Sequence, residues 1–216
     1  IGSGLVGSEM CIRDSYKTLA KQIGIELDRL NISVLSVDGV SFPTYMDILN
    51  AMKIYWISRT DNDIMKVPHK DEFRYAGIER CISFLLNYCN HSKTEKTTIE
   101  KYKAKMRFTN RDDISAETQD AVMTIVKILE NHDVLLAKEG LEEDLYNSPI
   151  QDDLKEFYGK ELSGDEIIAK MKDRKAINMY EFLKKKKSCL VKLKEDALAL
   201  PLIKAKKHIE KYYGTY

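Results

Sequence analysis

Residues 32–63 constrain the fold of this chain more than any other stretch, because they follow the order strand, turn, helix, strand. Residues 32–37 are rich in β-branched side chains and are followed by Asp38-Gly39, a pair that favours a tight turn. Pro43 then suits the first turn of a helix, and the apolar run 54–57 predicts a second buried strand. A strand–helix–strand unit of this length favours parallel strands. We therefore expect an α/β fold with a mostly parallel sheet flanked by helices.

Two carboxylates follow the second of these strands. Asp61 and Asp63 are separated by one residue, so in an extended segment their side chains point the same way. The carboxyl ends of parallel strands are where α/β sheets bind ligands. Carboxylates placed together repel each other unless a cation lies between them, and their hard oxygens suit Mg²⁺ or Mn²⁺. The sequence therefore predicts a metal site at Asp61 and Asp63.

Three motifs resemble the Toprim nuclease domain of the OLD-family (overcoming lysogenization defect) endonucleases: residues 37–42 (VDGVSF), 59–63 (RTDND) and 74–80 (RYAGIER). The resemblance extends over residues 16–187. It implies a Toprim-like Rossmannoid sheet, a DNA substrate and Mg²⁺ or Mn²⁺ as cofactor. It also implies an ATPase domain in the intact parent protein, which would provide any homo-oligomerisation.

The resemblance also implies a third metal ligand. Residues 133–137 predict a third strand, which runs into Leu141-Glu142, similar to the family's strand followed by a Leu-Glu pair. On this match Glu142 joins the metal site and the catalytic residues. The alternative is that Glu142 only belongs to the acidic first turn of a helix, where the helix dipole favours it.

A lysine completes the site that the resemblance implies. Residues 173–183 resemble the family segment that holds an active-site lysine, which makes Lys175 the candidate and Lys172 the alternative. A lysine near the scissile phosphate would offset the charge that develops in the transition state.

The charge of the chain is unevenly distributed, although the formal net charge is only +1. Residues 184–211 hold ten lysines and three acidic residues, a net +7 that leaves −6 for the remainder. The run at the start of this segment would contact the DNA backbone, because phosphate contacts are largely independent of base sequence. The alternative, to which we give equal weight, is that these lysines only form a solvated face of the protein. The candidate DNA-binding residues are Lys184, Lys185, Lys186 and Lys187.

The four cysteines show no Cys-x-x-Cys spacing and no metal-ligand pattern. We therefore expect reduced thiols in a cytoplasmic protein, without a disulfide framework. No apolar run approaches the roughly eighteen residues that a membrane-spanning helix needs.

We expect the chain to consist of three parts. Residues 1–15 resemble a translated sequencing adaptor, so we expect them to be non-native. Residues 16–187 would form the Toprim-like domain without its first strand, which in the family carries a Val-Glu-Gly-x-Ser-Glu motif; Glu9 is a poor substitute for it. Residues 188–216 would form a basic helical tail.

Three functions are compatible with these sequence features. The leading one is a metal-dependent DNA endonuclease domain that hydrolyses phosphodiesters with one or two divalent ions. The second is a fragment that binds DNA but is catalytically incomplete. The third is a receiver-like or phosphatase-like α/β domain with a phospho-accepting aspartate, in which replacing Asp61 would abolish phosphorylation by acetyl phosphate.

Overall fold

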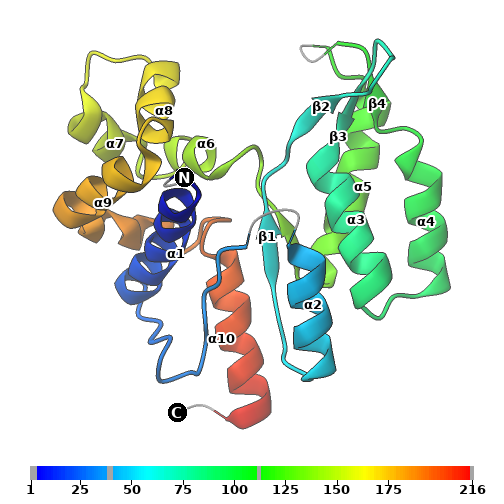
Figure 1. Cartoon of the computed structure of the whole chain (residues 1–216), viewed down its shortest axis with the longest axis horizontal. Helices are drawn as coiled ribbons and strands as arrows, with labels where there is room; N and C mark the ends of the chain where they lie inside the picture. Colours follow the sequence, from blue (N-terminus) through cyan, green and yellow to red (C-terminus); the bar gives the residue numbers. More distant parts are fainter. Residues whose placement is uncertain (1–3, 38–40, 111–112, 215–216) are drawn as a thin grey trace. The chain divides into compact units, whose positions relative to one another are not determined.

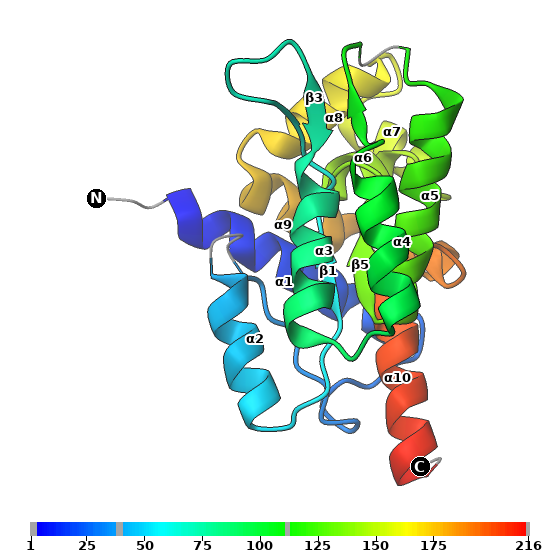
Figure 2. The ribbon, with the colours of Figure 1, turned by 90° about the vertical axis from the view of Figure 1, so that its right-hand side faces the viewer.

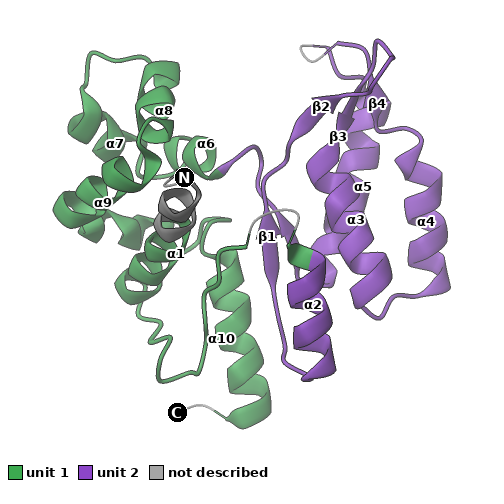
Figure 3. Ribbon diagram, viewed as in Figure 1, with its two compact units in different colours: residues 1–42, 141–216 green, residues 43–140 purple. Residues whose placement is uncertain are grey.

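The computed structural model describes residues 4–37, 41–110 and 113–214, with side chains described from residue 12 onward. The chain forms two compact units, coloured separately in Figure 3. Unit 1 comprises residues 1–42 and 141–216, and unit 2 comprises residues 43–140. None of the described helices is both long and apolar enough to pass through a membrane.

Unit 2 holds two small sheets. Strand β1 (Ser58–Thr60) pairs in parallel with β5 (Val134–Leu136). Strands β2 (Ile64–Lys66), β3 (Phe73–Tyr75) and β4 (Arg107–Phe108) form an antiparallel sheet in that order. The predicted α/β class and the third predicted strand are confirmed. A parallel pair is present, but it joins β1 to β5 and not residues 32–37 to residues 54–57. The antiparallel sheet was not anticipated.

Four helices accompany these strands: α2 (Phe42–Ala51), α3 (Ala76–Tyr88), α4 (Lys93–Lys103) and α5 (Ala116–Asn131). Both α3 and α5 pack on β5, and α4 packs on α5, an arrangement that can be followed in Figures 1 and 2. The core side of α3 and α5 is apolar at helical spacing, with Ile78, Leu85, Ile125 and Leu129 essentially inaccessible to solvent.

Two predicted strands are wrong: residues 54–57 precede the actual strand, and residues 32–37 form no strand. Residues 54–57 make no strand ladder; the strand begins at Ser58, whose N–H donates to the Asp133 carbonyl (3.1 Å). Pairing is limited there because β5 is itself short. Residues 32–37 also have no ladder, since the described part of unit 1 contains no strand to pair with. The turn expected at Asp38-Gly39 lies outside the described residues.

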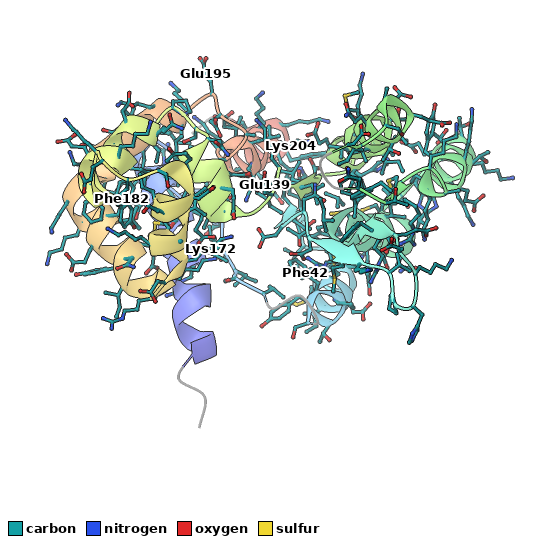
Figure 4. All side chains as sticks on the ribbon, turned by 90° about the horizontal axis from the view of Figure 1, so that it is seen from above. Phe42, Glu139, Lys172, Phe182, Glu195 and Lys204 are labelled. Atoms are coloured by element: carbon teal, nitrogen blue, oxygen red, sulfur yellow. The ribbon has the colours of Figure 1, made fainter. Side chains whose placement is uncertain are left out.

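The regular elements of unit 1 are all helices within its described residues. Its elements are α1 (Gly4–Gln22), α6 (Leu141–Tyr146), α7 (Gln151–Tyr158), α8 (Gly164–Lys172), α9 (Lys175–Lys186), the 3₁₀ helix η1 (Lys187–Leu193) and α10 (Leu200–Tyr213). Helix α1 packs against α9 and η1. Figure 4 shows Phe182 of α9 among these helices, and its side chain is fully buried.

Residues beyond 187 contribute to this same core. Cys189, Leu190, Leu193 and Leu202 are buried in one cluster with Leu19 of α1. The segment expected to be a basic tail therefore begins as a structural part of unit 1, and α10 follows it as the predicted final helix.

Candidate functional site

The two predicted aspartates follow the carboxyl end of β1, in unit 2. The loop that carries them is joined to the end of β5, because the Asn62 N–H donates to the Glu139 carbonyl (2.8 Å) and the Asn62 side-chain amide donates to the Lys138 carbonyl (3.2 Å). Asp61, Asp63 and Glu139 are all exposed. The acidic residues after two neighbouring parallel strands thus lie on tethered loops, as expected for a ligand-binding sheet edge. Sequence reasoning missed Glu139.

The first backbone N–H groups of helix α3 bind the main chain of Asp63. The Asp63 carbonyl accepts hydrogen bonds from the N–H groups of Ala76 (2.7 Å) and Gly77 (3.3 Å). Gly77 lies so close to this loop that an added Cβ would stand 2.7 Å from the Asn62 Cα and nearer still to the Asp61 carbonyl oxygen. A residue without a side chain is therefore needed at position 77 to hold the loop in this conformation.

Arg80 holds the side chain of the same aspartate. Its Nη2 donates to Asp63 Oδ2 (2.7 Å), and its Nη1 donates to the hydroxyl of Thr60, which is buried at the end of β1. One guanidinium thus joins the strand end to the acidic loop. Arg80 is the last residue of the 74–80 motif, but nothing in the sequence identified its partner.

The two predicted catalytic residues, Glu142 and Lys175, meet in unit 1. Glu142, on α6, has a side chain that is only 4% exposed, and its Oε1 lies 2.9 Å from the Nζ of Lys175 at the start of α9. The distance is that of an ion pair, although the two atoms are not aligned as a hydrogen bond. A buried carboxylate is costly without an opposite charge, so Lys175 compensates Glu142.

The turn before α9 directs this lysine. Arg174 adopts a left-handed conformation (φ 44°). The side-chain amide of Asn178 donates to the carbonyls of Lys170 (2.7 Å) and Asp173 (2.5 Å), which ties the end of α8 to α9. Lys172, the alternative catalytic lysine, instead pairs with Glu143, next to Glu142. Two ion pairs therefore connect α6 to the α8–α9 turn.

The four candidate DNA-binding lysines lie at the end of α9 and the start of η1. Three of them have neighbours that make their ammonium groups less available to DNA phosphates. Lys186 pairs with Glu156 (2.8 Å), Lys185 lies 3.9 Å from Glu181, and Lys184 stands over the Tyr180 ring. Lys187 is exposed and forms no ion pair with the described residues.

The expected metal ligands are divided between the units, with Asp61 and Asp63 in unit 2 and Glu142 in unit 1. Among the described residues, no group of three or more His, Cys, Asp or Glu side chains is placed to hold a metal ion. The carboxylate oxygens of Asp61 and Asp63 are nevertheless ligands of the type that suits Mg²⁺. Asn62 Oδ1, beside them, is buried and accepts no hydrogen bond in the described structure. The side chain of Glu9 lies outside the described residues.

Parts of the sequence and the fold as a whole are similar to OLD proteins. Residues 13–63 match the family model described as "Overcoming lysogenization defect protein-like, TOPRIM domain". The C-terminal region of the Burkholderia pseudomallei OLD protein is similar in structure over 92% of this chain and 93% of its own, with 16% identity and a TM-score of 0.53. The corresponding region of the Xanthomonas campestris pv. campestris OLD protein covers 93% and 92%, with 16% identity and a TM-score of 0.49. No curated protein gave a significant match.

Proposed function

We propose that this chain is the metal-dependent DNA endonuclease domain of an OLD-family nuclease. The OLD-like TOPRIM match over residues 13–63 and the similarity of the fold to an OLD C-terminal region support the proposal. The observation that carries the proposal is the Asp61-Asn62-Asp63 loop at the carboxyl end of β1, tethered both to the end of β5 and to α3. Carboxylates held in this way at a parallel strand end suit a divalent cation.

Asp61, Asp63 and Glu142 would hold the divalent ion, Mg²⁺ or Mn²⁺. When bound, such an ion activates the attacking water and stabilises the leaving oxygen of a phosphodiester. Arg80 holds one oxygen of Asp63 and leaves the other available as a ligand. Because Asp63 and Glu142 belong to different units, their convergence on one ion is part of the proposal.

Lys175 would act on the substrate rather than on the metal. An ammonium group beside the scissile phosphate lowers the energy of the transition state, in which negative charge accumulates on the phosphate oxygens. Glu142 would orient this lysine through the 2.9 Å ion pair. In the intact parent, the domain would work in the cytoplasm with an ATPase domain, on DNA, in a homo-oligomer formed through the parent.

A plasmid-nicking assay tests the proposal. We expect nicking with Mg²⁺ or Mn²⁺ and none in EDTA. Asp61→Asn should abolish nicking, and Lys175→Met should slow it by about 10²-fold or more, the cost of losing one transition-state charge partner. Asp47→Asn, an equally conservative change on the exposed face of α2, should leave nicking unchanged. Nicking by Asp61→Asn at the wild-type rate would exclude the aspartates from the metal site.

A catalytically incomplete DNA-binding fragment is the second candidate. The absence of a three-ligand acidic group among the described residues favours it. It predicts DNA binding with no metal-dependent nicking by the chain, and nicking once a first strand carrying the Val-Glu-Gly-x-Ser-Glu motif is restored at the N-terminus. Nicking by the unmodified chain would argue against this second candidate.

A further inference from the structure

An open groove of about 1290 Å³ runs along α1 in unit 1. One wall is α1 itself, and the other is formed by residues 24–36, which follow it in the sequence. Small-molecule sites usually measure roughly 300–1,000 Å³ and are mostly apolar. This groove is larger and carries charged residues along its length, so it is better suited to part of a charged polymer.

Cations are regularly spaced along the α1 wall. Arg13, Lys17 and Lys21 are four residues apart, so they share one face of the helix and follow one another at about 6 Å along its axis. Lys17 and Lys21 are exposed, and neither forms an ion pair with the described residues. Arg13 lies 3.5 Å from its neighbour Asp14. Lys17 and Lys21, the two lysines of this wall, lie beyond residues 1–15.

The opposite wall offers neutral hydrogen-bond donors. Ile32 and Val34 pack against the core of unit 1, while Ser33 is exposed and Ser36 is half-buried. The main chain of residues 33–36 forms no hydrogen bond with other described residues, so its amides are free to donate. Serine hydroxyls and backbone N–H groups are common partners of phosphate oxygens.

The remaining lining residues do not cancel this positive charge. Glu26 is paired with Arg29 (3.3 Å), which leaves Asp28 as the one lining carboxylate outside an ion pair in the described structure. No aromatic side chain lines the groove, so it provides no surface on which bases could stack. The groove would thus bind a ligand through the ligand's evenly spaced negative charges and not through its bases.

We propose that this groove binds the phosphodiester backbone of a single DNA strand, without regard to base sequence. The proposal rests on the proposed nuclease function and extends it, by giving unit 1 a DNA contact separate from the acidic loop of unit 2. A polymer with one negative charge at each repeat matches cations repeated at each helical turn. Lys17 and Lys21 are less neutralised than Lys185 and Lys186, which have carboxylate neighbours.

Fluorescence anisotropy with a labelled, mixed-sequence single-stranded oligonucleotide tests this in EDTA, where cleavage cannot contribute. The charge reversal Lys17→Glu/Lys21→Glu should weaken binding about tenfold or more at low salt and reduce the slope of log affinity against log salt by roughly 1.4, the value for two phosphate contacts on a single strand. Lys160→Glu/Lys194→Glu is the matched control, because both lysines are exposed in unit 1 and outside the groove. It should leave affinity and slope near the wild-type values.

Each contrary outcome has a specific meaning. Equal weakening by both double variants would show a bulk-charge effect and overturn the proposal. Tighter binding of duplex DNA through the same lysines would exclude a single strand as the ligand. Stronger binding of polyglutamate would assign the groove to an acidic peptide instead. Circular dichroism verifies that the variants fold. Because binding is measured in EDTA and does not depend on nicking, a failure of the nuclease proposal is distinguished from a failure of the groove proposal.

Discussion

At the scale of single residues, the candidate site depends on a few close contacts between segments far apart in sequence. Gly77 permits α3 to approach the Asp61–Asp63 loop, and Arg80 then binds Asp63. In unit 1, Lys175 neutralises the buried Glu142. Each of these contacts can be removed by one substitution.

Gly77→Ala should destabilise unit 2, because the added methyl group would overlap backbone atoms that cannot rotate away. We expect a loss of about 1–3 kcal/mol in the free energy of unfolding, measured in urea, as for other overpacked sites. Gly24→Ala is the control. Gly24 has a left-handed φ of 76° but open space around it, so its cost should be only the backbone term of about 1–2 kcal/mol. An unchanged stability of Gly77→Ala would contradict the close approach.

Lys175→Met should leave Glu142 buried and unpaired. We expect a loss of about 3 kcal/mol in the free energy of unfolding, at the lower end of the range for broken buried pairs because the Lys175 side chain is 23% exposed. Adding Glu142→Leu should restore most of that loss, since no charge then remains buried. Lys172→Met is the matched control and should cost less than about 1 kcal/mol, because Lys172 is half-exposed. A double variant less stable than Lys175→Met would refute the compensation.

At the scale of elements, side chains at helix N-termini explain where several helices begin. Ser92 and Ser163 each form a capping box with the glutamate three positions later, at the starts of α4 and α8. Ser115 caps α5 through the Thr118 N–H. Glu95, the partner of Ser92, also lies 2.9 Å from the Nε2 of His132, so this cap links α4 to the end of α5.

The Glu95 cap should give unit 2 a stability that depends on pH. The hydrogen bond from the Ser92 backbone N–H, followed by the contact with His132, lowers the pKa of Glu95 from 4.5 to about 2. A carboxyl group with a lowered folded-state pKa stabilises the fold above its unfolded pKa, and this contribution is lost as pH falls from 4.5 toward 2. In acid titrations followed by urea unfolding, Glu95→Gln should therefore show a shallower loss of stability over this window. Glu100→Gln, an exposed change on the same helix, should retain the wild-type slope; equal slopes in all three proteins would rule out the cap as the cause.

At the scale of the whole molecule, the chain consists of two units with separate cores, and each core contains a cysteine. Cys81 is buried in unit 2, where burial raises the pKa of its thiol to about 12. Cys189 is buried in unit 1, where burial raises the pKa of its thiol to about 11. Neither thiol is in a disulfide. Both should be unreactive in the native protein, because the thiolate is the reactive form.

Thiol labelling should consequently report the opening of each unit. In a background with Cys11 and Cys89 replaced by serine, we expect a thiol reagent to modify Cys81 and Cys189 only as urea unfolds the respective units. Mass spectrometry of the labelled peptides would give one transition for each unit. Rapid labelling of either residue in native buffer, at the rate seen in full denaturant, would contradict its burial.

The sequence predicted much of the local structure and part of the site. Pro43 located the start of a helix, because this signal acts within a few residues of itself. The strand at 133–137 was found by the same kind of local pattern. The strands expected at 32–37 and 54–57 were not, because an apolar extended run becomes a strand only where a neighbour completes its hydrogen bonds.

What the sequence determined by itself was therefore the α/β class, the helix start at Pro43 and the position of Asp61 and Asp63 after a strand, since all of these follow from neighbouring residues along the chain. Tertiary structure alone decided that β1 pairs with β5, that Arg80 binds Asp63 and that Lys175 neutralises Glu142. Those partners are far apart in sequence, and no local pattern specifies which distant backbone or charge will lie within hydrogen-bonding distance. Their contacts exist only once packing has excluded water and fixed the elements in place.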